Sequence, residues 1–326
     1  MDPLEKKELG STGLAVTRIG LGCASIGGLF GDIDQDQATR VVHRALDLGV
    51  TLFDTAPLYG AGRSERRLGR ALQGVPRDRY VLCTKVGRVL DPDPDAQAPA
   101  GEPAPLKAVF DFSRDGVLRS FDESLQRLRV DRIDVLHLHD PDNHYDEALG
   151  QAYPVLHRLR EEGAISGVSA GMNQSQMLAR FAREGDFDCF LLAGRYSLLE
   201  QGALDELLPL CVEKNIGILA GGTYNTGILA QGSGGEARYN YRQAPPEIVA
   251  RARRLEAIAE RHGVDVKAAA SQFVLAHPAV TSVIPGTRRP ERVEENVDVI
   301  RAAIPAAFWA ELKGEGLLPA AAPVPG

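Results

Sequence analysis

The sequence alternates along its length between short apolar segments typical of β-strands and longer segments with helical periodicity. We expect eight strands, at residues 18–23, 51–54, 80–85, 134–139, 165–170, 189–192, 216–220 and 281–285. Helical patterns cover residues 36–48, 64–72, 113–128, 145–162, 174–183, 203–215, 246–262, 267–276 and 290–303. This alternation predicts a parallel sheet with crossover helices, because parallel neighbours can be joined only by long connections.

Eight such units predict closure into a (β/α)8 barrel, that is, a TIM barrel of the α/β class. An open doubly wound sheet is the structural alternative, but no G-x-G-x-x-G follows any early strand, which disfavours a dinucleotide-binding open sheet. We expect one domain over residues 1–326, with an N-terminal β-hairpin turning at Gly10-Ser11-Thr12-Gly13 and a flexible tail at 315–326.

Two connections, residues 86–112 and 221–244, are longer than is usual between a strand and a helix. Both follow strand ends and would therefore lie on the face of the barrel where active sites form. We interpret them as lids or pocket walls.

Composition narrows the class of protein and its partners. The apolar content of 44% and charged content of 25% are ordinary for a soluble globular chain, and the net charge of −7 disfavours nucleic-acid binding. The four cysteines have no metal-ligand spacing, and neither a signal peptide nor a membrane span is evident. We therefore expect no metal, a cytoplasmic protein, a small-molecule substrate, and a monomer or weak homo-oligomer.

Three ionisable residues stand where successive strands should end: Asp54, Lys85 and His139. Tyr59 follows Asp54 in the same loop. In a barrel the carboxyl ends of the strands meet on one face, so these four side chains would gather there. Each residue alone has ordinary structural uses, but their convergence predicts a proton-transfer site built around a phenol.

The phenol of Tyr59 would carry the proton, although an unperturbed tyrosine has a pKa of about 10. The Lys85 ammonium would favour the phenolate, Asp54 would hold Lys85 by a salt bridge, and His139 would donate to a substrate oxygen or share a proton with Tyr59. Such a site can protonate a carbonyl or deprotonate an alcohol. The redox change itself needs a hydride source such as a nicotinamide.

Two nearby features receive a structural interpretation. His137 shares the strand face of His139 but lies one pleat deeper, and we interpret it as a residue of the barrel core. Gly167-Val168-Ser169-Ala170-Gly171 has the letters of a nucleophile elbow, but it lies within a barrel strand and the sequence indicates no base for Ser169.

A basic loop, Pro285-Gly286-Thr287-Arg288-Arg289-Pro290-Glu291-Arg292, follows the eighth strand and begins a helix at Pro290. Barrel phosphate sites commonly use the last loops and a helix N-terminus, where arginines bind phosphate in a forked geometry. A solvated helix start is the alternative interpretation.

Over its whole length the chain resembles the aldo-keto reductase family. The resemblance rests on Phe53-Asp54-Thr55-Ala56-Pro57-Leu58-Tyr59-Gly60, Ser64-Glu65, Thr84-Lys85, Ser124-Leu125-Gln126-Arg127-Leu128 and Arg132-Ile133-Asp134 leading to His139. It implies a barrel that binds NADP(H) or NAD(H), with a slight preference for NADP(H), and a catalytic tetrad of Asp54, Tyr59, Lys85 and His139.

Other runs resemble one branch of that family, the D-threo-aldose (L-fucose) 1-dehydrogenases and pyridoxal 4-dehydrogenases. They include His139-Asp140-Pro141-Asp142 and Gly171-Met172-Asn173-Gln174. The likeness implies oxidation of a cyclic hemiacetal, of a sugar or of pyridoxal, to a lactone. The alternatives are a general aldehyde or ketone reductase, a non-catalytic NADPH-binding regulatory subunit, and a Schiff-base aldolase using Lys85.

The family resemblance also implies where the cofactor binds. Ser169 and Asn173 would contact the nicotinamide amide, and the Gly221-Gly222-Thr223 turn would pass beside the ring and pyrophosphate. Many family members have a lysine at the position of Gly286 and a glutamine at that of Gly194. The remaining cofactor-binding positions are Gly286, Thr287, Arg288, Arg292, Glu295 and Asn296.

Overall fold

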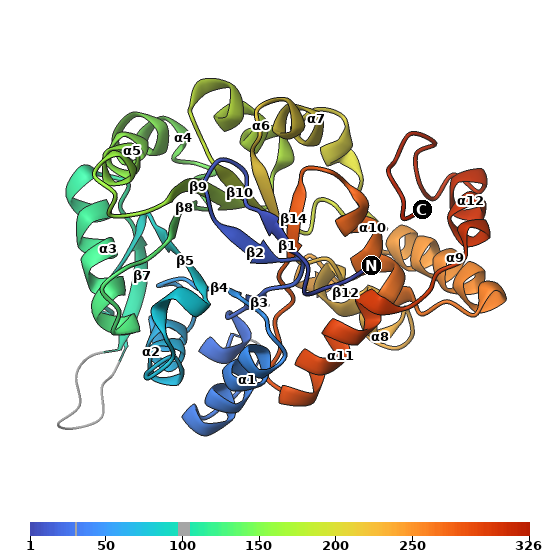
Figure 1. Ribbon diagram of the computed structural model, residues 1–326, viewed down its shortest axis with the longest axis horizontal. Helices are drawn as coiled ribbons and strands as arrows, with labels where there is room; N and C mark the ends of the chain where they lie inside the picture. Colours follow the sequence, from blue (N-terminus) through green and yellow to red (C-terminus); the bar gives the residue numbers. More distant parts are fainter. Residues whose placement is uncertain (30, 97–104) are drawn as a thin grey trace.

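The computed structural model describes residues 1–29, 31–96 and 105–326, and its centre is a parallel eight-stranded sheet (Figure 1). The strands are β3 (Leu21–Gly22), β4 (Leu52–Asp54), β5 (Val81–Val86), β8 (Val135–His139), β9 (Gly167–Met172), β10 (Cys189–Ala193), β11 (Gly217–Gly221) and β14 (Val280–Val283). They are paired in the order β14-β11-β10-β9-β8-β5-β4-β3. All eight expected strands are therefore confirmed, with bounds shifted by a few residues.

Backbone contacts between the first and last strands close the sheet. Ile19 pairs with Val283 in a parallel bridge, the Gly20 amide donates to the Val283 carbonyl at 2.8 Å, and the Gly22 amide donates to the Pro285 carbonyl at 3.2 Å. The (β/α)8 barrel expected from the sequence is thus confirmed, and the carboxyl ends of its strands share one face.

Helices surround the strands (Figure 1). The α-helices are α1 (Gln35–Asp47), α2 (Arg63–Ala71), α3 (Arg114–Leu128), α4 (Tyr145–Glu147), α5 (Tyr153–Glu161), α6 (Ser175–Glu184), α7 (Leu207–Glu213), α8 (Ile228–Gln231), α9 (Pro246–His262), α10 (Val266–Ala276), α11 (Pro290–Arg301) and α12 (Ala306–Gly314). Short turns are η1 (Ser25–Gly27), η2 (Arg77–Arg79), the π-type η3 (Ala148–Ala152), η4 (Gly202–Leu204) and η5 (Asn225–Gly227). Ser113 caps α3 by accepting from the Gly116 amide, as its type predicts.

Three segments carry more structure than the sequence indicated. The connection after β5 forms an antiparallel hairpin of β6 (Arg88–Pro92) and β7 (Leu106–Phe110), although its middle lies outside the described residues. The connection after β11 contains α8 and a second hairpin, β12 (Arg238–Tyr239) with β13 (Arg242–Gln243). The segment expected to be a flexible tail packs instead, because Leu317, Leu318 and Ala322 are buried in the core.

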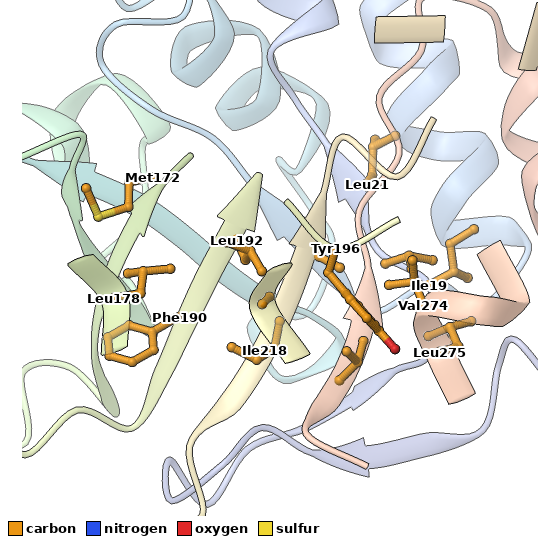
Figure 2. Packing of buried hydrophobic residues seen from close by; sticks show 14 of the residues in the cluster. Ile19, Leu21, Met172, Leu178, Phe190, Leu192, Tyr196, Ile218, Val274 and Leu275 are labelled. Atoms are coloured by element: carbon orange, nitrogen blue, oxygen red, sulfur yellow. The ribbon is translucent and has the colours of Figure 1, made fainter. Parts of the chain in front are cut away.

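The buried apolar residues form two layers. The larger lies between the strands and the helices, and Figure 2 shows part of it, including Phe190, Leu192 and Ile218. The smaller lies inside the barrel, where Leu9 and Val16 of the N-terminal hairpin, β1 (Lys6–Glu8) with β2 (Ala15–Thr17), pack against strand residues such as Leu52 and Leu219. The hairpin therefore fills the amino end of the barrel, and the carboxyl end is left for chemistry.

One buried ion pair joins the second unit of the barrel to the third. Glu65 of α2 has no exposed surface, and its carboxylate accepts from the Arg127 Nε of α3 at 2.6 Å and from the Thr84 hydroxyl of β5 at 2.7 Å. A buried charge is tolerated only when it is paired and hydrogen-bonded, as this one is. The pair fixes α2 and α3 against the strand that carries Lys85.

Glu65→Leu should lower the free energy of unfolding by about 3 kcal/mol, because it leaves the Arg127 guanidinium buried without this partner. Urea titration followed by circular dichroism measures the loss. A matched control is Glu162→Leu, which breaks the exposed Arg158–Glu162 pair and should cost less than about 1 kcal/mol. Equal losses in the two variants would contradict the structural role of Glu65.

Candidate active site

The strand-end residues expected to converge do so at the carboxyl face of the barrel. Asp54 ends β4, Lys85 lies near the end of β5 and His139 ends β8. The Lys85 ammonium donates to both carboxylate oxygens of Asp54, each at 2.7 Å, and to the Thr55 carbonyl at 2.9 Å. These three acceptors match the three N–H groups of an ammonium.

The ion pair of Asp54 and Lys85 is almost fully buried, with side-chain exposures of 3% and 2%. Burial disfavours the charged form of each residue, but the attraction of the oppositely charged partner outweighs this effect. The pKa of Asp54 is consequently lowered, with Lys85 and His137 opposing the effect of burial, and the pKa of Lys85 is raised by Asp54 and Tyr59. Lys85 is therefore a fixed cation rather than a free amine.

Tyr59 lies in the loop between β4 and α2, next to both Lys85 and His139. The Lys85 Nζ is 5.1 Å from the centre of the phenol ring, and the His139 ring meets it edge-on at 5.9 Å between centroids. Burial raises the pKa of Tyr59 to about 12, against the opposing charge of Lys85. Lys85 thus favours the phenolate as expected, but burial has the larger effect and Tyr59 is a protonated phenol at neutral pH.

His139 is a neutral imidazole. Burial, together with the nearby charges of Lys85 and Arg88, holds the pKa of His139 well below its ordinary value. Its Nε2 is 3.6 Å from Oδ2 of Asp140, which accepts from Arg88 of β6 at 3.0 Å. A neutral imidazole carries one N–H, so His139 can donate a hydrogen bond to a substrate oxygen.

A cavity of about 790 Å³ begins at Asp54 and Tyr59 and extends to the start of α11. This volume is in the usual range for small-molecule sites. Many of the residues expected to bind a cofactor line it, namely Asn173, Gly221, Gly222, Thr223, Gly286, Thr287, Arg288, Arg292 and Asn296. The cavity therefore connects Asp54 and Tyr59 with the basic loop.

Four of the predicted site residues do not line this cavity. Lys85 and His139 are buried next to Tyr59, with 2% and 4% of their surfaces exposed. Ser169 is fully buried and its hydroxyl contacts His137 at 2.6 Å, so contact with a nicotinamide amide remains a prediction that this geometry does not support. Glu295 binds its neighbours Arg292 and Lys267 instead of facing the cavity.

Glycines make a narrow cradle in the middle of the cavity. Gly222 has a φ of 62°, and a Cβ there would lie 3.1 Å from the amide nitrogen of Gly194. A Cβ on Gly286 would lie 2.8 Å from the Gly22 carbonyl oxygen and 3.0 Å from the Ser25 hydroxyl. A side chain at position 286 would therefore require the neighbouring loop to shift.

Basic side chains gather at the far end of the cavity. Arg288, Arg289 and Arg292 line it from the start of α11, and Lys267 of α10 lines it although only 6% of its surface is exposed. Glu295 accepts from Lys267 at 2.6 Å and from Arg292 through both carboxylate oxygens, at 2.7 and 2.6 Å. Four cations against one carboxylate make this end suited to phosphate.

Sequence patterns did not indicate several residues of the site. Asn240 and Tyr241 reach the cavity from the turn of the β12–β13 hairpin, and Lys267 reaches it from the first turn of α10. Arg88 approaches His139 through Asp140, whose backbone has a positive φ of 44°. For Arg88, Asn240 and Tyr241 the sequence signal was their position in the connections expected to form pocket walls, whereas Lys267 lies outside both connections.

Within residues 1–29, 31–96 and 105–326, no group of three or more His, Cys, Asp and Glu side chains is arranged to hold a metal ion. Over the same residues, no helix is long and apolar enough to cross a membrane.

Comparisons with known proteins agree with this architecture. The model of the aldo/keto reductase family matches residues 18–314. The chain is 42% identical to the D-threo-aldose 1-dehydrogenase of a Pseudomonas species, over 95% of this chain and 97% of that protein. It is 41% identical to the pyridoxal 4-dehydrogenase of Microbacterium luteolum, over 96% and 98% of the two chains.

Solved structures give the same result. The holo form of an aldo-keto reductase from Bacillus halodurans superimposes with a TM-score of 0.77 at 25% identity, over 97% of each chain. The glycerol dehydrogenase of Gluconobacter oxydans does so with a TM-score of 0.74 at 25% identity, also over 97% of each. From the family match and these near full-length similarities, the chain belongs to the aldo-keto reductase family and is an NAD(P)-dependent oxidoreductase.

Proposed function

We propose that this protein oxidises the hemiacetal C–OH of a small polar substrate, a sugar such as L-fucose or a related aldose, or pyridoxal, to a lactone. The observation that carries the proposal is the cluster of Asp54, Tyr59, Lys85 and His139 at the inner end of a cavity whose outer end is basic. The names of two relatives described above, an aldose 1-dehydrogenase and a pyridoxal 4-dehydrogenase, support this substrate class.

In this mechanism Tyr59 exchanges a proton with the substrate oxygen. His139, as a neutral donor, holds that oxygen, and Lys85 lowers the cost of forming the phenolate. Asp54 keeps Lys85 charged and in place. In the direction of oxidation the phenolate form of Tyr59 takes the hydroxyl proton and becomes the phenol, and in reduction the phenol gives that proton to the carbonyl oxygen and becomes the phenolate.

The nicotinamide cofactor supplies the chemistry that these side chains lack, by accepting or donating a hydride. Gly221 and Gly222 would lie beside the ring and the pyrophosphate, because these glycines add no side chain to the cavity wall. Asn173 would hold the amide, and Arg288 and Arg292 the phosphates. The four cations favour NADP(H) slightly, although Glu295 neutralises part of their charge.

The geometry argues against a Schiff-base aldolase. Such an enzyme needs a neutral lysine amine as its nucleophile. Lys85 is instead held as an ammonium by Asp54 and the Thr55 carbonyl, and its pKa is raised.

The decisive experiment is an oxidation screen with NAD+ and NADP+ over L-fucose, other aldoses, pyridoxal and simple alcohols, read by nicotinamide absorbance. Identification of a lactone by mass spectrometry would support the proposed function. Fast reduction of simple aldehydes without hemiacetal oxidation would instead make the protein a general carbonyl reductase.

Tyr59→Phe should lower kcat by roughly 10²–10⁴-fold, the usual effect of losing a general acid or base. Cofactor affinity, measured by quenching of protein fluorescence, should stay near that of the wild type because the ring is retained. As a matched control, Tyr153→Phe changes a tyrosine that donates to no catalytic group and should leave kcat unaltered. A Tyr59→Phe enzyme with near wild-type kcat would exclude the phenol as the proton carrier.

Lys85→Met should move the pH at which oxidation accelerates to higher values. The positive charge of Lys85 lowers the pKa of Tyr59, so its removal leaves the phenol protonated up to a higher pH. Measurement of kcat/KM against pH for the wild type and the variant tests this, with exposed Lys214→Met as the control. If the pH at which kcat/KM rises is the same in the variant and the wild type, Lys85 serves only to pair with Asp54.

Arg292→Ala should weaken NADP+ binding by roughly 10- to 100-fold more than NAD+ binding, the value of one charge-assisted hydrogen bond to phosphate. Glu295→Gln should strengthen NADP+ binding more than NAD+ binding, because it releases Arg292 and Lys267 from a competing carboxylate. Fluorescence titration with both cofactors distinguishes the two variants. Equal losses of NAD+ and NADP+ affinity in Arg292→Ala would show that Arg292 does not bind the 2′-phosphate.

A further inference from the structure

A second polar chain lies beneath the Asp54–Lys85 pair, outside the four residues of the proposed mechanism. His137 of β8 has no exposed surface, and its Nε2 is 3.3 Å from Oδ1 of Asp54. On the other side of the ring, Nδ1 is 2.6 Å from the hydroxyl of Ser169, which is also fully buried. His137 was expected to be an inert core residue, but it links β9 to the catalytic carboxylate.

Strand register explains why these groups meet. Lys85 of β5 is the direct cross-strand partner of His137, and His137 is the direct partner of Ser169 on β9. The three side chains therefore form one row across neighbouring parallel strands. Asp54 reaches this row from β4 and contacts both Lys85 and His137.

Hydrogen-bond chemistry fixes the direction of the chain. An ionised carboxylate only accepts, so the Nε2 facing Asp54 must carry the proton of the imidazole. Burial keeps the pKa of His137 below its ordinary value, so the ring is neutral and Nδ1 is its acceptor. The Ser169 hydroxyl then donates to Nδ1, and the tautomer is set from both sides.

The order serine, histidine, aspartate also occurs in hydrolases, where the serine is the nucleophile. Here the hydroxyl of Ser169 cannot take that role. The Ser169 hydroxyl is sealed inside the barrel and does not line the cavity, so no substrate reaches it. Asp54 is already bound through both oxygens to Lys85. The role left to the chain is to hold Asp54.

We propose that His137, oriented by Ser169, is a positioning residue that keeps Asp54 ionised and aimed at Lys85, so that it helps to set the lower pH limit at which the enzyme works. The proposal rests on the oxidoreductase function proposed above. The titratable groups around His137 are Asp54 on β4, Lys85 on β5 and His139 on its own strand. Asp54 is the one among them that Nε2 of His137 approaches, at 3.3 Å.

The test measures kcat/KM against pH for carbonyl reduction, the direction in which Tyr59 acts as a protonated phenol and therefore gives no loss of activity at low pH. It compares His137→Leu, which removes the donor, with His137→Gln, whose amide can still donate to Asp54. The distance of 3.3 Å between Nε2 of His137 and Oδ1 of Asp54 is long for a hydrogen bond, so we expect a shift of no more than about one pH unit. The acid limb, the pH range in which kcat/KM falls as the pH is lowered, should therefore lie about one pH unit higher in His137→Leu than in the wild type. His137→Gln should keep the wild-type limb.

His277→Leu is the matched control, because His277 is also a buried histidine but bonds to the Ala279 amide near the amino end of β14. Its acid limb should not move. A His137→Leu enzyme with reduced kcat and an unmoved limb would overturn the proposal and reduce His137 to a packing residue.

A second measurement is made on the wild-type protein, and the variant His137→Gln serves only to assign its signals. In the wild-type protein labelled with ¹⁵N-histidine, the ring signals that disappear in His137→Gln belong to His137, and they should report a neutral Nε2–H tautomer that does not titrate between pH 5 and 9. A titrating ring or an Nδ1–H tautomer would overturn the proposal. This result stands even if no substrate in the oxidation screen is turned over, so the failure of the function and that of the His137 chain can be told apart.

Discussion

The ion pair of Asp54 and Lys85 is the constraint on which the active site depends. Two charges with almost no exposed surface are tolerated only if every donor and acceptor is satisfied. Lys85 achieves this with both oxygens of Asp54 and the Thr55 carbonyl, which ties the end of β5 to the end of β4 and to the loop that carries Tyr59. The contacts that stabilise the two buried charges therefore also hold the loop that positions the phenol of Tyr59.

The sequence was sufficient to predict the barrel because its strands are buried on both faces and appear as short apolar runs at regular spacing. It also predicted that Asp54, Lys85 and His139 would meet, since parallel topology alone brings strand ends together. The contact of His137 with Asp54 could not be foreseen in this way. It depends on side-chain reach across a strand register that the sequence does not specify.

Other differences have similarly local causes. The segment 315–326 is short and rich in Pro and Ala, which suggested a flexible tail, but Leu317 and Leu318 pack into the core and the Leu317 carbonyl accepts from Arg251. The glycine at position 286 looked like a missing cation, whereas its neighbours Gly22 and Ser25 leave no room for a side chain. In both cases the deciding partner is more than 60 residues away in the sequence.

The hairpin at the amino end of the barrel has a consequence for how the protein responds to salt. Because Leu9 and Val16 seal that end, mobile ions have no approach from below to the pair at the base of the cavity, and dissolved counterions screen buried charges only weakly. Arg288 and Arg292, by contrast, lie at a partly or fully exposed rim. On the proposed function, ionic strength would act on the capture of a phosphate-bearing cofactor and scarcely on the proton transfer, because the rim of the cavity is screened by salt and its base is not.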